Sequence, residues 1–178
     1  MGTGQMLSVL GAIMILSMVS LAINTMIIGK TTTMLEAEAS LTAISLAQTM
    51  IDEIQTKNYD LATVAQKVYD PTLFTASSGL GPSSTEIGNV PLPDAATPFK
   101  SYKYYNDVDD YNGYRRTAST PLLGKFTIVD TVYYVSESNP NQKLSTQTFF
   151  KKIVVTVTHP NMSYALQISD LAVYRRYF

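Results

Sequence analysis

The first part of the chain has an unbroken apolar pattern. No charged residue occurs before Lys30, and Met6–Gly29 consists mostly of Leu, Ile, Val, Met and Ala. A helix rises about 1.5 Å per residue, so this segment is long enough to cross the roughly 30 Å hydrocarbon core of a bilayer. A secretory signal peptide would begin with Lys or Arg and would have a shorter apolar run. We therefore expect residues 1–29 to form a hydrophobic helix that enters a membrane and is retained in the mature protein.

Helical spacing continues beyond Lys30. Apolar residues recur at intervals of three and four, at Met34, Ala37, Leu41, Ile44, Ala47, Ile51 and Ile54. The polar side of the same helix is expected to carry Glu36, Glu38, Thr42, Ser45, Asp52 and Glu53. The pattern predicts one helix over about residues 4–58, amphipathic over residues 30–58, and no proline precedes Pro71 to break it. We expect Leu41–Ile54 to pack on the chain's own head domain, and the earlier half to pack on helices of other copies.

The rest of the chain reads as a loop followed by strands. Residues 70–100 are rich in Pro, Gly and Ser, which predicts a long surface loop without regular helix turns. Apolar and polar residues then alternate with a period of two in Phe126–Val135, Phe149–Thr158 and Tyr164–Ser169. We predict an antiparallel sheet within residues 101–178, with one face over the helix. The fold class is α+β: a long N-terminal hydrophobic helix packed on a C-terminal antiparallel sheet, with residues 30–178 as the head.

Composition excludes several kinds of function. The chain has 13 Lys and Arg against 14 Asp and Glu, so it has no field that would attract a polyanion, and nucleic acid is not an expected partner. Cysteine is absent, which excludes disulfides and thiolate metal sites. The single histidine, His159, precedes a proline in a predicted turn and is expected to be exposed. No Cys–His or Ser–His pattern and no glycine-rich phosphate loop is present, so no enzymatic activity is expected.

One short run concentrates acidic residues before a glycine. Carboxylates at alternate positions followed by a glycine turn can gather oxygens around a calcium ion, although the downstream glutamate of an EF-hand is missing. The simpler interpretation, which we favour, is an acidic, solvent-exposed turn, and no other cofactor is expected. The candidate calcium ligands are Asp107, Asp109, Asp110 and Asn112. The arginines that are expected to pair with these acids, within or between subunits, are Arg115, Arg116, Arg175 and Arg176.

The order of these segments resembles the type IV pilins and the pseudopilins of type II secretion. Ala37–Leu41, Ala47–Ile54 and Asn106–Tyr114 are similar to the minor-pilin and pseudopilin branch. The resemblance implies a structural subunit of an extracellular filament for adhesion, motility or secretion, together with the methylation known in that family. Its partners would be copies of itself, the inner-membrane assembly machinery and, before assembly in the inner membrane, lipid. The residues that would carry assembly are Gln5, Leu7, Leu10, Ile13, Ile15, Leu16 and Leu21.

The N-terminal string departs from the family pattern. The basic residue and glycine that end the family's leader, and the Phe-Thr-Leu-Ile-Glu-like start after them, are missing. If Met1 is the mature N-terminus, Gln5 stands where pilins carry a glutamate, and an amide cannot neutralise a buried ammonium. If cleavage follows Gly2 or Gly4, the fifth residue is Leu7 or Val9. The alternatives to a filament subunit are a monomeric membrane-anchored domain that binds a partner or ligand, and a signal-anchored enzyme.

Overall fold

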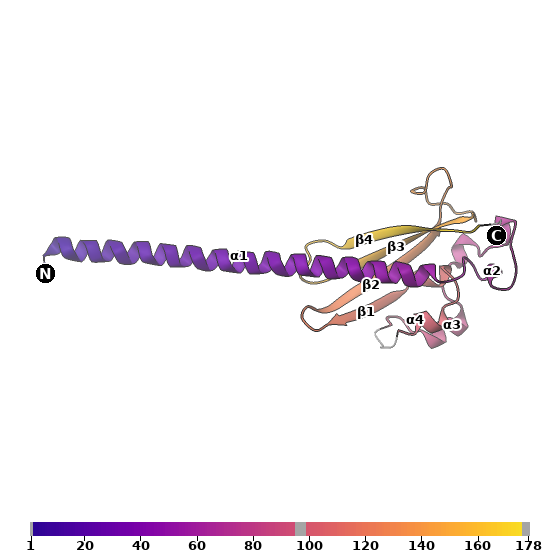
Figure 1. Ribbon diagram of the computed structural model, residues 1–178, viewed down its shortest axis with the longest axis horizontal. Coiled ribbons are helices and arrows are strands. Elements are labelled where there is room, and N and C mark those ends of the chain that lie inside the picture. The colour runs from indigo at the N-terminus through magenta and orange to yellow at the C-terminus, as the bar shows by residue number, and fades with distance from the viewer. Residues whose placement is uncertain (1, 95–98, 176–178) are drawn as a thin grey trace. The chain divides into compact units, whose positions relative to one another are not determined.

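The structure, a computed structural model, describes residues 2–94 and 99–175. Residues 1–38 and residues 39–178 form two compact units, and the helix α1 (Thr3–Gln55) runs through both. The second unit, the head, contains the end of α1 and a four-stranded antiparallel sheet (Figure 1). The predicted α+β class, with a long apolar N-terminal helix packed against an antiparallel sheet, is confirmed.

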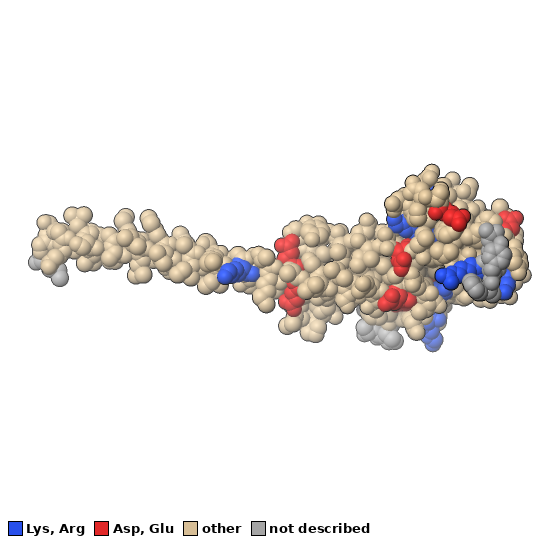
Figure 2. Space-filling view, turned by 45° about the horizontal axis from the view of Figure 1, so that its top comes forward, with Lys and Arg blue, Asp and Glu red and all other residues tan. Residues whose placement is uncertain are grey.

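Within the first unit, α1 presents its side chains to the outside. Every described residue from Gly2 to Leu35 is exposed. Hydroxyl groups of Ser8 and Ser17 donate to carbonyls one turn earlier, at 2.7 and 2.8 Å, so they need no external partner. Figure 2 shows this segment largely free of charged side chains on the visible face. By length and composition, α1 is able to cross a membrane, which agrees with the predicted hydrophobic helix.

The sheet of the head is a meander in chain order. The strands are β1 (Arg115–Thr120), β2 (Gly124–Tyr134), β3 (Phe150–Thr158) and β4 (Leu166–Val173), and each pairs antiparallel with the next. The last three agree with the predicted period-two runs, whereas β1 was not predicted. Its sequence, RRTAST, has a single apolar residue, Ala118, so it lacks the alternation that marks a half-buried strand.

Short helical turns fill the segments between α1 and the sheet. They are α2 (Ala62–Ala65), η1 (Pro71–Leu73), η2 (Ser77–Gly79), α3 (Ser84–Asn89), α4 (Ser101–Tyr104) and η3 (Asp109–Tyr111). The prediction that residues 70–100 hold no helix turns is therefore wrong. The α3 helix forms because Ser83 and Glu86 make a capping box, in which the Ser83 amide donates to Glu86 Oε2 at 2.7 Å. Pro98 of the predicted loop lies outside the described residues.

A row of alanines forms the contact between α1 and the sheet. Ala39, Ala43 and Ala47 recur every four residues on one side of the helix, are completely buried, and belong to the core that also contains residues of the sheet. Further along the helix, Met50, Ile51 and Ile54 belong to the same core, and the sheet contributes Ile128, Val132, Ile153, Val155 and Val157. This face agrees with the predicted stripe at Ala47, Ile51 and Ile54.

The predicted stripe is wrong for its larger residues nearer the start of the head. Leu41 is 69% exposed and Ile44 is 37% exposed. Residues two apart in a helix lie on opposite sides, so burying Ala39 and Ala43 turns Leu41 outward. Apolar size misled the prediction, because in this part of the helix the buried residues are alanines.

The orientation of α1 on the sheet can be tested by a pair of substitutions. We expect Ala43→Leu to lower the free energy of unfolding of the head by about 1–3 kcal/mol, because a larger side chain overpacks a buried position. Leu41→Ala, on the opposite side, should change it by less than about 0.5 kcal/mol. Urea unfolding of the full chain in detergent, followed by circular dichroism, measures both. A larger loss for Leu41→Ala would contradict this orientation.

Candidate functional site

The predicted assembly residues all lie on α1 in the first unit. The six apolar members are between 55% and 72% exposed, and Gln5 is exposed as well. Because each residue turns the helix by about 100°, these positions are spread around the helix and do not form a single stripe. A helix that is apolar on all sides is typical of an environment that is apolar all round, either lipid or a bundle of other helices.

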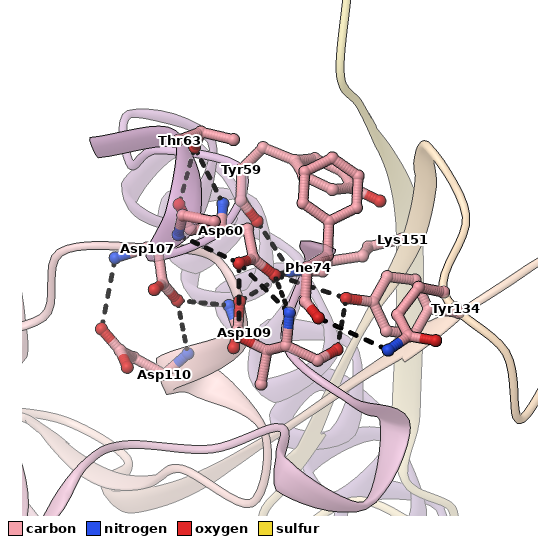
Figure 3. A network of polar contacts seen from close by, with 12 residues as sticks. Tyr59, Asp60, Thr63, Phe74, Asp107, Asp109, Asp110, Tyr134 and Lys151 are labelled. Carbon is pink, nitrogen blue, oxygen red and sulfur yellow. Dashed lines mark hydrogen bonds and ion pairs between the residues drawn. The ribbon is translucent and has the colours of Figure 1, made fainter. Parts of the chain in front are cut away.

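The acidic run at residues 107–110 is buried inside the head. Asp107, Asp109 and Asp110 are only 2–3% exposed, so the favoured interpretation as a solvent-exposed turn is wrong. Asp107 Oδ1 accepts hydrogen bonds from the backbone amides of Asp109 and Asp110 at 3.0 and 3.2 Å. Asp110 Oδ2 accepts from the amides of Asn106 and Asp107 at 2.9 and 3.2 Å. These bonds fold the run into the tight turn that includes η3 (Figure 3).

The fourth candidate ligand, Asn112, faces other partners. Its Nδ2 donates to the carbonyl of Leu80 at 3.0 Å, and its Oδ1 accepts from the amide of Val132 at 3.2 Å. Over the described residues, no group of three or more His, Cys, Asp or Glu side chains is arranged to hold a metal ion. Calcium binding stays a prediction, and a cation at the acidic run would have to displace the donors that already occupy these oxygens.

Lys151 completes the acidic cluster, and sequence reasoning did not identify it. Its side chain is fully buried, and Nζ lies 2.6 Å from Asp109 Oδ1 and 2.9 Å from Asp60 Oδ2. Nζ also donates to the carbonyl of Tyr59 at 2.8 Å. The signal in the sequence was its position in β3. Lys151 lies two residues before Ile153, and side chains two apart in a strand are on the same face of the sheet, so Lys151 also faces the core.

Asp60 is the most heavily hydrogen-bonded carboxylate of this cluster. The backbone amide of Thr75 donates to Oδ2 at 3.0 Å, the amide of Ala62 donates to Oδ1 at 3.2 Å, and the Tyr134 hydroxyl lies 3.3 Å from Oδ2. The ring of Tyr134 also lies beside Lys151 Nζ, 5.3 Å from ring centroid to nitrogen. Several hydrogen-bond donors thus converge on the Asp60 carboxyl group, directly beside Lys151.

The protonation of the acidic run follows from its burial. Burial, the charge of Asp109 and a side-chain hydrogen bond with Asp109 together raise the pKa of Asp107 to about 9, although Lys151 opposes the rise. Burial raises the pKa of Asp110 to about 6, against the two amide donors that stabilise its anion. At neutral pH Asp107 therefore holds a proton and can donate a hydrogen bond to Asp109.

A second ionic cluster joins the end of α1 to β1. Arg116 Nη2 lies 2.9 Å from Glu53 Oε1, and both side chains are almost completely buried. Tyr111 and Ser101 donate hydroxyl bonds to the same oxygen at 2.8 and 2.7 Å, and Arg116 also contacts Ser101. Glu53 was expected on the polar outer side of the helix, so that prediction is wrong. The reason is a partner 63 residues away, which helical periodicity cannot reveal.

The predicted pairing of arginines with the acidic run is not found. Arg116 pairs with Glu53, and the acidic run pairs with Lys151. Within the described part of the chain, Arg115 and Arg175 form no ion pair with these acids. Arg176 lies outside the described residues.

His159 is also buried, contrary to the prediction of an exposed turn residue. Its ring stacks on Phe126 with the ring centroids 4.2 Å apart, and Nε2 donates to the carbonyl of Leu123 at 2.8 Å. Nδ1 accepts from the amide of Asn161 at 3.1 Å. The turn between β3 and β4 folds the ring back over β2, so His159 acts as a packing residue.

Asp130 is a buried acid without a hydrogen-bond partner. It lies in the middle of β2, opposite Val155 of β3, and neither carboxylate oxygen is hydrogen-bonded within the described structure. Burial raises the pKa of Asp130 well above its ordinary value, with Arg116 opposing and Glu53 adding to the rise. Burial thus favours the protonated form of Asp130 in the folded head.

Comparison with protein-family models, with curated proteins and with solved structures found no match for this chain.

The raised pKa of Asp130 predicts a pH-dependent stability. The folded head binds this proton more tightly than the unfolded chain, so the stabilisation is complete below the ordinary pKa of 3.8 and is lost as pH rises toward the folded pKa. Above about pH 4, Asp130 should make the free energy of unfolding of the wild type fall by at most about 1.4 kcal/mol per pH unit. We expect Asp130→Asn to abolish this fall. Urea unfolding between about pH 4 and pH 8 compares the slopes of the wild type and the variant.

A contrasting control is Asp70→Asn. Hydrogen bonds from Thr72 lower the pKa of Asp70, so its contribution is present near neutral pH and is lost as pH falls. Asp70→Asn should therefore change the free energy of unfolding at low pH only. Its fall at higher pH should stay as in the wild type. Parallel profiles for the wild type and Asp130→Asn would contradict the assignment.

Proposed function

We propose that this chain is a structural subunit of a type IV pilus-like extracellular filament, assembled through α1, and not an enzyme. The observation that carries the proposal is the exposed apolar side of α1 within the head. Leu41 faces away from the sheet and Ile44, at the edge of the buried side, is partly exposed, although a helix that served only the head would place polar residues there. In the first unit Met34 and Ala37 precede them at helical spacing and are also exposed.

An anchored monomer explains this side of the helix less well. Spanning a bilayer takes about 20 apolar residues, and the charge-free segment before Lys30 already supplies them. Leu41 lies beyond that segment, on the side of the helix opposite the alanine row, and an exposed apolar side chain there is suited to contact with the same helix in neighbouring copies. The monomeric membrane-anchored domain that binds a partner or ligand is the alternative.

The proposal implies two environments for the same helix. Before assembly, lipid of the inner membrane would surround the apolar segment, and assembly machinery in that membrane would transfer it to the growing filament. In the filament at the cell surface, other copies of α1 would replace the lipid. The near-zero net charge gives no electrostatic attraction for nucleic acid, which is not among the proposed partners. Adhesion, motility or secretion would be the role of the assembled filament.

The proposal predicts different outcomes for glutamate at three exposed leucines. Leu10→Glu should abolish filaments, because a bundle of apolar helices would bury an unpaired carboxylate. Leu41→Glu should reduce the number of filaments at least tenfold without changing the unfolding of the head. Leu122→Glu, in the turn between β1 and β2, is the matched control, since this leucine is 85% exposed, and it should leave filaments unchanged.

Negative-stain microscopy of sheared cell-surface material, with mass spectrometry of the main band, measures these outcomes. Undiminished filaments from Leu10→Glu would show that α1 does not hold the assembly together. If wild-type cells yield the chain only as a membrane-bound monomer, the anchored-domain alternative replaces the filament.

A further inference from the structure

The contact between Lys151 and Asp109 has the geometry of a reaction site as well as that of an ion pair. Nζ and Oδ1 are 2.6 Å apart, and both side chains are sealed from solvent. Asp60 touches the same nitrogen from another side at 2.9 Å. The aromatic rings of Tyr59 and Tyr134 flank the amine, at 4.5 and 5.3 Å from centroid to Nζ. An amine, two carboxyl groups and an apolar wall therefore meet at one buried point (Figure 3).

We propose that Lys151 and Asp109 condense to an intramolecular isopeptide bond, an amide between Lys151 Nζ and Asp109 Cγ. The bond would join β3 to η3, which are 42 residues apart in the chain. This proposal does not depend on the filament function, since it rests on the interior of the head alone.

The two neighbouring carboxyl groups have different roles. Asp60 Oδ2 lies 2.9 Å from Nζ and the carboxyl group is positioned by the amides of Ala62 and Thr75, so it is placed to take a proton from the Lys151 ammonium and leave a nucleophilic amine. Asp107 is hydrogen-bonded to Asp109 and has a pKa of about 9, so at neutral pH it has a proton to give to a departing oxygen of Asp109. Asp109, which lies between the amine and the acid, is the carboxyl group that is attacked.

The atoms balance without an external reagent. The Lys151 nitrogen forms a bond to Asp109 Cγ, and one bond from Cγ to oxygen breaks. The ammonium loses two of its three protons, and the departing oxygen leaves with two protons as water. Asp60 and Asp107 pass protons and end in the protonation states in which they began. One ammonium and one carboxylate thus become one amide and one water.

Burial favours this condensation in two ways. Two opposite charges in a low-dielectric interior are expensive to desolvate, and the amide removes both of them, while Asp60 keeps the hydrogen bonds that the amides of Ala62 and Thr75 donate to it. Fixing the amine against the carboxyl group also replaces a bimolecular encounter, and well-oriented groups react as if at an effective concentration of about 10⁵–10⁸ M. Once the released water has left, the burial of the cluster keeps bulk water from hydrolysing the amide.

The test is the mass of the wild-type protein and of its tryptic peptides. The full chain, purified in detergent and then denatured, should contain a form that is lighter by one water than the same chain without the bond. Trypsin does not cleave after an acylated lysine, so a branched peptide should join residues 104–115 to residues 144–152. Fragmentation should place the branch at Asp109 and Lys151.

Variants separate the bond from an ordinary ion pair. Asp109→Asn should give the same branched product by loss of ammonia in place of water. Lys151→Arg should abolish the branch, whereas Lys152→Arg, the neighbouring lysine, should retain it. Asp107→Asn removes the acid but keeps the shape, and it should lower the branched fraction at least tenfold in freshly made protein.

Three results would overturn the proposal. The first is a full yield of the linear peptides 104–115 and 144–151 from folded wild-type protein. The second is a branch from residues 58–67, which would place the bond at Asp60. The third is a branched fraction in Asp107→Asn equal to that of the wild type, which would remove the assigned acid. The wild-type measurement decides the first two even if a variant fails to fold.

Discussion

The burial of Ala39, Ala43 and Ala47 in the core that α1 shares with the sheet sets the orientation of the helix in the head. These three residues lie on one side of the helix, and that side faces inward. The same rotation turns Leu41 outward and leaves Ile44 at the edge of the buried side. One helix thereby has two different apolar sides, a small-residue side that meets its own sheet and a large-residue side that does not.

Two ionic clusters hold the end of that helix in place. The first ties Glu53 to Arg116 of β1, and the second ties Asp60, just beyond α1, to Lys151 of β3. Removing one partner of such a pair leaves an unpaired buried charge, which costs about 3–5 kcal/mol. Buried ions are therefore a demanding way to fasten the helix, because each pair must stay complete.

Local patterns in the sequence predicted the long helix and most of the strands. Which polar side chains are buried depends on partners that lie far away in the chain. The α1 helix and strands β2 to β4 could be predicted, because apolar spacing reports which side of an element is covered. The β1 strand could not, because Ala118 alone gives no alternation. The acidic run was found as a motif, but its burial was missed, since that depends on Lys151, 42 residues beyond Asp109. Glu53 and His159 were misplaced for the same reason, as no local pattern identifies their partners.

The distance between Asp60 and Lys151 in the chain has a consequence for synthesis. After Asp60 has been synthesised, the ribosome must add 91 more residues to reach Lys151, the cation that pairs with Asp60. During that interval α1 and its carboxylates are complete, while β3, which supplies Lys151 and the core residues Ile153, Val155 and Val157, is still missing. The helix therefore has to wait for its sheet, and a nascent head cannot close from its N-terminal side. Translation would release a closed head only after β3 has left the exit tunnel.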